Sequence, residues 1–184
     1  MQDNFASSLT DLYLLYSNIP QSVSLCLSQM NLELEKFNES LTSLIAILIQ
    51  GSLYIFNTGY HNALLLSFEG EVLATLFEDG VNSYNSVIAE AEKTIIEAIG
   101  KSNIPKLCGE VVNWVRIDLM RESRARYLAL ITDPAWKIIV KEDTTKLINE
   151  FMTEETIAEK FGAIALEKGC KSDIIVAIVN LTKL

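Results

Sequence analysis

The segment from residue 41 to residue 76 constrains the fold of this chain more than any other feature of the sequence. It alternates short apolar runs with glycine-containing turns. The runs cover residues 41–49, 52–57, 63–68 and 71–76, and the turns between them are Gln50-Gly51, Thr58-Gly59 and Glu69-Gly70. Apolar runs of this length between such turns are typical of β-strands joined as hairpins. We therefore predict an antiparallel β-meander over residues 41–76.

Two amphipathic segments precede the meander. Apolar residues at helical spacing predict helices over residues 4–17 and 21–39, separated by Pro20, which breaks the pattern. The second stripe covers only about two heptads, so we favour packing against a sheet over a coiled coil. The two stripes consist of Phe5, Leu9, Leu12 and Tyr16, and of Val23, Leu27, Met30, Leu34 and Phe37.

The second half of the chain mixes helical and strand-like patterns. Gly100 is expected to end one helix, and Thr153 is expected to cap the start of another. The expected helices cover residues 81–99, 135–151 and 154–168, and the expected strands cover residues 110–119, 126–132 and 173–181. Together these elements predict an α+β fold, with antiparallel β-sheets covered by helices, in a single domain over residues 1–184.

Composition excludes several classes of protein. The chain has 184 residues, 49% of them hydrophobic and 21% charged, which is enough for one domain with a real core. A net charge of -9 disfavours nucleic acid as a partner, because binding a phosphate backbone requires clustered Lys and Arg. Signal-peptide features and membrane-spanning apolar runs are missing, so we expect no membrane insertion and a cytoplasmic location. We expect Cys26, Cys108 and Cys170 to be reduced and mostly buried thiols.

Three segments match the motifs of one known family in the same order. The first is Leu53-Tyr54-Ile55-Phe56-Asn57-Thr58-Gly59. The second is the strand 127–132 followed by Asp133-Pro134-Ala135-Trp136-Lys137, and the third is 165–176, which contains Gly169 and ends in Ser172-Asp173-Ile174-Ile175-Val176. These segments resemble the metal-dependent Ser/Thr phosphatases of the protein phosphatase 2C family. The corresponding motifs of that family are Leu-Tyr-x-Ala-Asn-x-Gly-Asp-Ser-Arg, Asp-Gly-x-Trp-Asp and Gly-Ser-x-Asp-Asn-Ile-Thr-Val.

The resemblance also implies that the chemistry of the family is lost. Phosphoester hydrolysis of this kind uses two divalent ions held by several carboxylates. Asp133 remains, but Lys137 replaces the second Asp of its motif, and Ser172 occupies a metal-binding position with Asp173 beside it. The family's Arg-x-x-x-Glu-Asp and Asp-Gly-His-Gly segments are missing, which implies a sandwich that is incomplete at its N-terminus. We expect no catalytic residues and no metal cofactor, with Asp133 and Asp173 as degenerate remnants and Asp133 as a helix cap.

These observations predict a pseudophosphatase that binds a protein partner or belongs to a multi-subunit assembly. Missing strands would leave sheet edges or an apolar face open. One alternative is a metal-dependent Ser/Thr phosphatase that is completed by a partner chain, or that uses Asp133 and Asp173 with one Mg²⁺ or Mn²⁺ ion. Another is an unrelated α+β binding domain. The candidate interface residues are Phe5, Leu9, Tyr16 and Trp114.

Other side chains that could carry chemistry have simpler interpretations. His61 is the only histidine, so a metal site built from several imidazoles is excluded and a turn residue is expected. Trp136 is expected to anchor the core. Four arginines straddle a predicted strand and turn, so we favour a solvated charged loop over a phosphate site. They are Arg116, Arg121, Arg124 and Arg126.

Overall fold

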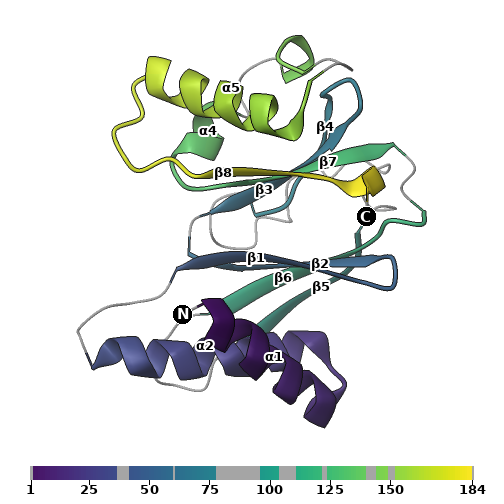
Figure 1. Ribbon diagram of the computed structural model, residues 1–184, viewed down its shortest axis with the longest axis vertical. Helices are drawn as coiled ribbons and strands as arrows, with labels where there is room; N and C mark the ends of the chain where they lie inside the picture. Colours follow the sequence, from purple (N-terminus) through teal and green to yellow (C-terminus); the bar gives the residue numbers. More distant parts are fainter. Residues whose placement is uncertain are drawn as a thin grey trace.

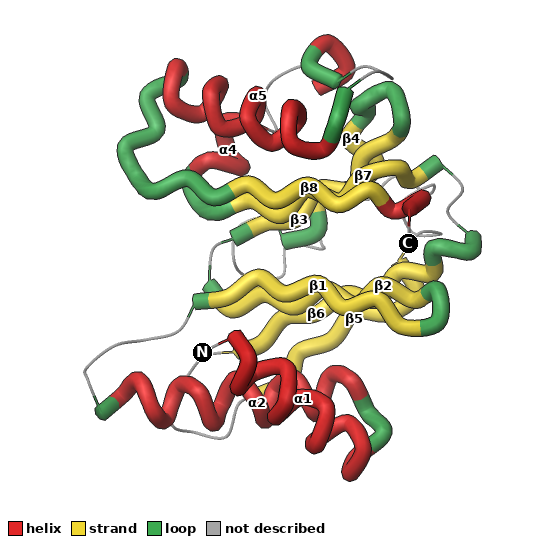
Figure 2. The backbone as a smooth tube through the Cα atoms, viewed as in Figure 1, coloured by secondary structure: helices red, strands yellow, loops and turns green. Residues whose placement is uncertain are grey.

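The protein is an α+β sandwich in which two antiparallel sheets lie face to face and helices cover the outer face of each (Figures 1 and 2). Both sheets have four strands in the part of the chain described here. The computed structural model describes residues 2–36, 42–59, 61–77, 96–103, 111–121, 124–139, 144–148 and 152–183. Antiparallel sheets covered by helices were predicted from the sequence, and this fold class is confirmed.

The first sheet, sheet A, has the strand order β1-β2-β6-β5. Its strands are β1 (Ser43–Ile49), β2 (Ser52–Thr58), β5 (Ile96–Asn103) and β6 (Val111–Asp118). Ile49 of β1 pairs with Ser52 of β2, so Gln50 and Gly51 alone form the hairpin turn. Both turn residues have positive φ angles, 50° and 77°, as a type I′ turn requires, and glycine adopts such angles without steric cost.

The second sheet, sheet B, has the strand order β4-β3-β7-β8. Its strands are β3 (Asn62–Ser67), β4 (Val72–Thr75), β7 (Ala125–Ile131) and β8 (Val176–Asn180). All six residues of β3 are buried, because one face of this central strand packs on sheet A and the other packs under helices. The edges of the described part of this sheet are β4 and β8.

Two helices cover sheet A. These are α1 (Gln2–Tyr16) and α2 (Ile19–Glu35), which pack on each other below the sheet in Figure 1. Asn18 caps α2, since its side chain accepts a hydrogen bond of 3.0 Å from the backbone N–H of Gln21. Pro20 therefore lies in the first helical turn, where its missing N–H removes no helical hydrogen bond.

Sheet B is covered by the helix α5 (Glu154–Glu167), the short helix α4 (Ala135–Ile139) and the 3₁₀ turn η1 (Thr144–Lys146). Thr153 caps α5 as predicted, because its hydroxyl accepts a 3.2 Å hydrogen bond from the backbone N–H of Thr156. A second 3₁₀ turn, η2 (Leu181–Lys183), follows β8.

The buried apolar side chains form three clusters that follow the layers. The cluster between the two sheets includes Leu53, Ile55, Leu65, Val115 and Leu128. The cluster between sheet B and its helices includes Leu64, Tyr127, Trp136 and Phe161, and the cluster between α2 and sheet A includes Val23, Leu27, Phe56 and Val112. Trp136 is only 3% exposed, so it anchors the core as predicted.

Two predicted strand arrangements differ from the structure. The segment 41–76 is not one meander, because β2 belongs to sheet A and β3 to sheet B. Thr58-Gly59 therefore begins a crossing between the sheets instead of a hairpin turn. The segment predicted as a strand over residues 173–181 is a strand only from Val176 to Asn180, and it lies at a half-exposed edge of the described part of sheet B.

Two predicted helices also differ. The helix expected over residues 81–99 is wrong at its end, because Ile96–Ile99 belong to β5 and Gly100 pairs with Trp114; residues 81–95 lie outside the described part. Pairing with β6 overrides the local helical spacing there. The helix expected over residues 135–151 ends at Ile139 and is followed by η1, while 140–143 and 149–151 lie outside the described part.

Two of the four arginines are not part of a solvated loop. Arg116 lies in β6, and its guanidinium carbon is 5.6 Å from the centroid of the Tyr54 ring. Arg126 lies in β7, 5.3 Å from the centroid of the Phe68 ring. Both side chains are half-buried against aromatic rings, so the prediction of a solvated loop is wrong for these two residues.

Cys26 and Cys170 are buried and form no disulfide, as predicted, while Cys108 lies outside the described residues. Among the helices that the structure describes, none is both long enough and apolar enough to cross a bilayer.

Candidate functional site

Five polar residues gather at one end of the sandwich, where strands of both sheets begin or end. Asn57, near the end of β2, lies opposite Asn113 of β6. The chain passes from β2 to β3 at this end, and the first residue of β3 pairs with the last residue of β7. Strand pairing thus brings together residues that are far apart in the sequence. We call this group the polar end cluster, and its members are Asn57, His61, Asn62, Asn113 and Asp133.

Each member of the polar end cluster has a buried polar atom without a hydrogen-bond partner. These atoms are Oδ1 of Asn57, Nδ1 of His61, Nδ2 of Asn62, Oδ1 of Asn113 and Oδ1 of Asp133. Buried polar groups are nearly always hydrogen-bonded, and a missing partner costs about 1–3 kcal/mol. One further atom of this kind, Nε of Arg126, occurs in the described residues. The concentration of such atoms at one end of the sandwich identifies the candidate site.

Asn57 organises the connection between the sheets. Its side-chain Nδ2 donates hydrogen bonds to the carbonyl oxygens of His61, at 2.8 Å, and of Gly59, at 3.4 Å. Gly59 has a φ angle of 108°, which favours glycine. Asn62 continues the arrangement, since its Oδ1 accepts hydrogen bonds from the backbone N–H groups of Ala63 and Phe77. The Nδ2 group of Asn57 therefore holds the connection between β2 and β3, and the Oδ1 atom has no hydrogen-bond partner.

Asp133 follows β7 directly and forms an ion pair with a lysine. Its Oδ1 lies 3.1 Å from Nζ of Lys137, although the angles are not those of a hydrogen bond. The Lys137 ammonium also lies 5.6 Å from the centroid of the Trp136 ring. A positive charge therefore stands beside the carboxylate, and another cation approaching Oδ1 would be repelled by it.

The prediction that Asp133 caps the following helix needs correction. The backbone N–H of Trp136 donates to the carbonyl of Thr132 at 3.3 Å, and that of Lys137 donates to the carbonyl of Pro134 at 3.1 Å. Oδ1 of Asp133 accepts no hydrogen bond. The main chain thus supplies the acceptors for these two N–H groups, and Oδ1 of Asp133 lies beside the Lys137 ammonium instead of at a helical N–H group.

The segment that contains Asp173 lies beside Asp133, but its carboxylate is exposed. Thr132 connects the two segments, because its N–H donates to the carbonyl of Ile175 at 3.1 Å and its hydroxyl accepts from the Ile175 N–H at 3.0 Å. The Thr132 hydroxyl also approaches the carbonyl oxygen of Asp173 at 3.3 Å. Ser172 and Asp173 are exposed residues at the rim of this end. The sheet therefore brings the two predicted remnants near each other, one half-buried and the other at the surface.

The pKa of His61 is shifted by its surroundings. Burial lowers the pKa of its imidazole below the ordinary value of 6.5, and the negative charge of Asp133 opposes this shift. The two residues are thus close enough to interact electrostatically.

The residues present do not fit a pair of hard divalent ions. Magnesium and manganese prefer several oxygen ligands, and two ions require several carboxylates to balance their charge. The polar end cluster contains one carboxylate, and Lys137 already pairs with it. In the part of the chain that the structure describes, no three His, Cys, Asp or Glu residues are placed so that they could hold one metal ion.

The predicted interface residues are not members of the polar end cluster. Leu9 and Trp114 are half-buried and pack against the cluster between α2 and sheet A. The side chains of Phe5 and Tyr16 lie outside the part that the structure describes. Leu9 therefore contributes to helix packing.

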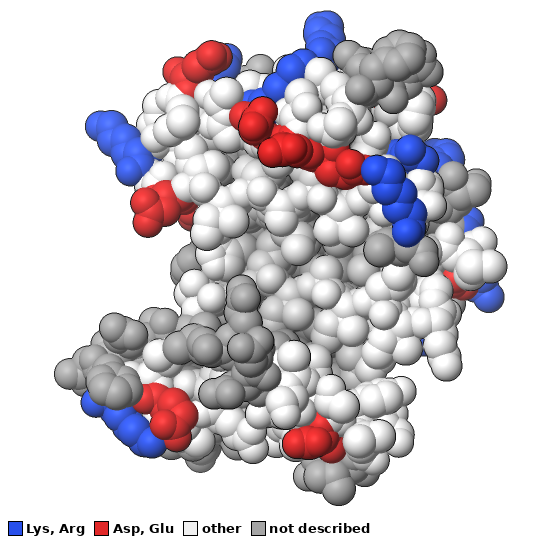
Figure 3. All heavy atoms as spheres, in the orientation of Figure 1, with Lys and Arg blue, Asp and Glu red and all other residues white. Residues whose placement is uncertain are grey.

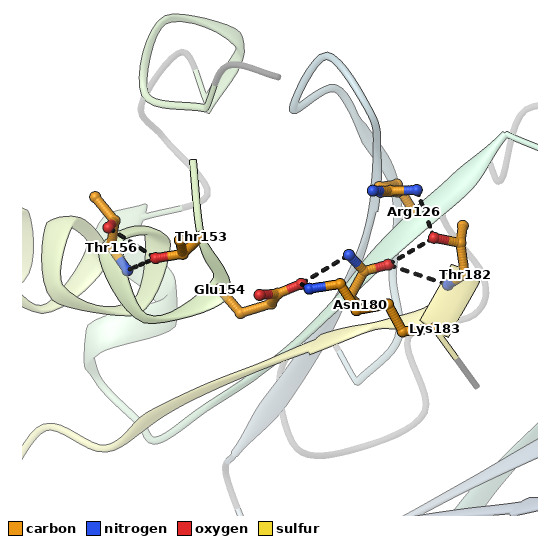
Figure 4. Close-up of polar contacts among 7 residues, drawn as sticks. All are labelled: Arg126, Thr153, Glu154, Thr156, Asn180, Thr182 and Lys183. Atoms are coloured by element: carbon orange, nitrogen blue, oxygen red, sulfur yellow. Dashed lines mark hydrogen bonds and ion pairs between the residues drawn. The ribbon is translucent and has the colours of Figure 1, made fainter. Parts of the chain in front are cut away.

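A second polar network lies at the other end of β8, and its role is structural (Figure 4). Glu154 accepts a 2.7 Å hydrogen bond from Nδ2 of Asn180 and pairs with Nζ of Lys183 at 2.7 Å. Oδ1 of Asn180 accepts from the N–H and hydroxyl of Thr182, which also contacts Arg126. Hydrogen bonding by Lys183, with smaller effects of the Glu154 backbone and Asn180, lowers the pKa of Glu154 to about 2. These contacts fasten the C-terminal turn to α5.

Solved phosphatase structures share this fold. A bacterial serine phosphatase superposes with a TM-score of 0.58 at 12% identity, over 88% of this chain and 67% of that one. Serine/threonine phosphatase Stp1 from Staphylococcus aureus gives 0.58 at 12% identity, over 88% and 65%. The phosphatase domain of SpoIIE from Bacillus subtilis gives 0.54 at 13% identity, over 96% and 71%. No protein-family model matches the sequence, and no curated protein does.

These comparisons define a class of fold. The chain has the α+β fold of the phosphatase 2C-like serine phosphatases, as the sequence resemblance implied. It spans about two thirds of the length of the chains it matches, from 65% to 71%. At 12–13% identity the likeness shows the fold alone.

Few signals in the sequence indicated the polar end cluster. Asn57 belongs to a motif of the resemblance, but its buried oxygen could not be foreseen. Asn113 had no signal at all, because its relation to Asn57 depends on the pairing of β2 with β6. His61 was expected in a turn, and the structure places it next to Asp133.

Proposed function

We propose that this chain is a catalytically inactive protein with a phosphatase fold, which serves as a structural or protein-binding subunit of a larger assembly. The observation that carries the proposal is the ion pair between Asp133 and Lys137, 3.1 Å apart. Metal-dependent hydrolysis needs carboxylates that are available to two cations. Here the carboxylate of the polar end cluster is matched by a lysine, and Ser172 and Lys137 stand where the phosphatase 2C motifs have metal-binding or acidic residues.

The open side of the sandwich supports the second half of the proposal. Among the strands that the structure describes, β1 and β8 lie at edges of the two sheets, and both are on the side nearest the viewer in Figures 1 and 2. All seven residues of β1 are half-buried, since its side chains pack on the clusters on either side of sheet A, and none is charged. Figure 3 shows this side, where the atoms drawn in white form an uncharged band between charged rims. An apolar edge strand without charges favours pairing with another chain.

Metal uptake and phosphatase activity test the first half. Calorimetric titration with Mn²⁺ is expected to show no binding, and a phosphopeptide hydrolysis assay is expected to show no turnover. Turnover that Asp133→Ala abolishes would refute the proposal. The variant Lys137→Asp removes the competing ammonium and adds a carboxylate, so it is expected to bind Mn²⁺ more tightly than the wild-type chain.

A pair of lysine variants tests the second half. Ala46→Lys places a charge in the middle of β1, where the Ala46 side chain packs against the cluster between the sheets, and Ala163→Lys places the same charge on an exposed position of α5. Thermal unfolding selects the temperature at which both variants are folded, and the comparison is made there. If β1 pairs with a partner strand, cross-linked complexes captured with the full chain from its source cells are lost in Ala46→Lys and retained in Ala163→Lys. Equal capture by both variants would contradict a partner at β1.

One observation favours an enzyme as the second candidate function. The unpartnered oxygens of Asn57 and Asn113 are buried acceptors near Asp133, and oxygen atoms of this type can bind Mg²⁺ or Mn²⁺. A partner chain that supplied further carboxylates would convert this end into a phosphatase site. The same hydrolysis assay, repeated with the captured complex, tests this alternative, and activity found in the complex alone would support it.

A further inference from the structure

The strand β8 forms an exposed apolar edge of the described part of sheet B. Ile175, just before the strand, is 65% exposed, and Ala177 within it is also exposed. Residues 174–182 include no charged residue and no proline, and β8 pairs with β7 without a register shift. Charges, prolines and bulges are the usual means by which a strand edge is kept from pairing with another chain. The segment 175–179, which we call the β8 edge, has none of them.

The backbone of β8 presents donors and acceptors at this edge. The Ile175 carbonyl accepts a 3.1 Å hydrogen bond from the Thr132 N–H, and the Ile175 N–H donates to the Thr132 hydroxyl at 3.0 Å. Both backbone groups of Ile175 therefore face the side of β7. Successive residues of a strand point their N–H and C=O groups to opposite sides. Val176 and Ile178 thus direct theirs away from β7, towards the open edge.

The two faces of β8 have different surroundings. Val179 packs on the cluster between the sheets, and Ile175 and Ala177 share its face because side chains alternate along a strand. Val176 and Ile178 pack on the cluster between sheet B and its helices. A strand added beside β8 would therefore place alternate side chains next to the apolar layer between the sheets, and the remaining side chains next to α5.

The flank of α5 at this edge is acidic. Figure 3 shows acidic side chains over α5, along the border of the uncharged band. Glu155 and Glu159 are exposed and lie one helical turn apart. The nearby lysines do not neutralise them, since Lys183 pairs with Glu154 at 2.7 Å and the Lys160 ammonium donates to a backbone carbonyl beyond η1 at 3.3 Å. Basic side chains on an added strand would complement these two carboxylates.

The same charges disfavour a second copy of this chain as the occupant. Two copies paired through β8 would bring their α5 helices side by side, so that Glu155 and Glu159 of both copies would approach one another. Each copy also has a net charge of -9. A basic partner encounters the opposite situation, because the surface next to the apolar edge attracts it.

We propose that the β8 edge binds an extended segment of a partner protein in which apolar residues alternate with lysine or arginine. The segment pairs with the backbone of Val176 and Ile178. Its apolar side chains cover Ile175 and Ala177, and its basic side chains face α5. This proposal rests on the proposed function, because it specifies a class of partner for a protein-binding subunit, but it places that partner at β8 and not at β1.

Hydrogen exchange in the ¹⁵N-labelled full chain tests the pairing. The probe is a short peptide in which valine and lysine alternate. It is expected to slow the exchange of the Val176 and Ile178 N–H groups, which point to the open edge, and to leave Ala177 and Val179 unchanged, because their N–H groups face β7. A version that is N-methylated at every residue keeps the side chains and charges but cannot donate strand hydrogen bonds, so it is expected to give no protection.

Glutamine variants test the contribution of charge. Glu155→Gln with Glu159→Gln removes two charges from α5, and Glu69→Gln with Glu71→Gln removes two charges from exposed positions in the turn after β3. At equal ionic strength the valine-lysine peptide is expected to bind about threefold to tenfold more weakly to the first double variant and equally well to the second. Thermal unfolding shows whether both are folded.

Three results would overturn the proposal. The first is no protection of Val176 and Ile178 by the valine-lysine peptide up to about 1 mM. The second is equal protection by the N-methylated peptide or by a peptide in which valine and glutamate alternate. The third is equal weakening in the two folded double variants.

Exchange at β1 separates failure of this proposal from failure of the proposed function. The Ser43 N–H donates to the Thr58 hydroxyl of β2 at 2.8 Å, so Leu44, Ala46 and Leu48 direct their N–H groups away from β2. Protection of these three groups alone would contradict a site at β8 and leave a partner at β1 possible. Protection at β8 together with phosphatase turnover would retain the β8 site and refute an inactive protein.

Discussion

Three glycine-to-alanine variants test how the outer layer of sheet B is fastened to the sheet. Gly70, in the turn after β3, has a φ of 82°, and a Cβ atom there would lie 2.7 Å from the Thr144 carbonyl oxygen and 2.8 Å from Cβ of Ile148. Gly169 has a φ of 87°, but a Cβ there would meet no atom within 4 Å. Gly162 lies inside α5 and is equally uncrowded. The three positions thus separate backbone strain from steric overlap.

The expected changes follow from these distances and angles. A left-handed conformation costs a non-glycine residue about 1–2 kcal/mol, so Gly169→Ala should lose about that much stability. Gly70→Ala has the same strain and must also displace backbone at a distance that real Cβ contacts do not show, which adds about 1–3 kcal/mol. Its total loss is therefore about 2–5 kcal/mol. Gly162→Ala should gain about 0.5–1 kcal/mol, because alanine favours a helix over glycine.

Urea unfolding of the wild-type chain and the three variants at neutral pH provides the measurement. The denaturant dependence of the unfolding free energy should be the same in all four, so that shifts of the midpoint report stability alone. The expected order of stability is Gly162→Ala, wild type, Gly169→Ala and Gly70→Ala. If Gly70→Ala were no less stable than Gly169→Ala, the segment 144–148 would not pack on the turn after β3, and this account of the outer layer would be wrong.

Three further predictions concern titration and capping. The contacts of Glu154 lower its pKa to about 2 from an ordinary 4.5, so they stabilise the fold above pH 4.5 and this contribution is lost as the pH falls towards 2. The urea midpoints of the wild type and of Glu154→Gln should therefore converge over that range. Burial lowers the pKa of His61, so as the pH falls below 6.5 the imidazole is protonated in the unfolded chain before it is protonated in the folded one, and the unfolding free energy should fall. His61→Gln should make the unfolding free energy less dependent on pH below 6.5, and an unchanged dependence would contradict this prediction. Thr153→Ala should lower the unfolding free energy by about 1 kcal/mol, and no loss would show that the cap does not stabilise α5.

Local patterns were sufficient to locate most strands but not to assign them to sheets. The turn at Gln50-Gly51 was predicted because two residues between two apolar runs leave few other conformations. The corner at Thr58-Gly59 has similar residues, yet the chain crosses there from sheet A to sheet B. The difference is not local, because it depends on which strands pair with β2 and β3, and those partners, β6 and β7, come more than fifty residues later.

The helix expected to end at Gly100 shows a second limit. Its apolar residues have helical spacing, and glycine commonly follows the end of a helix. In the structure Ile99 and Gly100 pair with Val115 and Trp114 of β6. A short apolar segment satisfies either pattern, and hydrogen bonding to a neighbouring strand determines which one forms. The spacing of residues within the segment does not show that β6 will lie beside it.

The candidate site was harder to predict than the fold, because it depends on the surroundings of a cation. The Lys137 ammonium lies 5.6 Å from the centroid of the Trp136 ring and 3.1 Å from Oδ1 of Asp133. The sequence shows the two residues four positions apart, but this spacing does not determine whether their charges meet. The conformation of the turn and short helix between them brings the two charges together, so the carboxylate that the resemblance singled out is paired with a lysine.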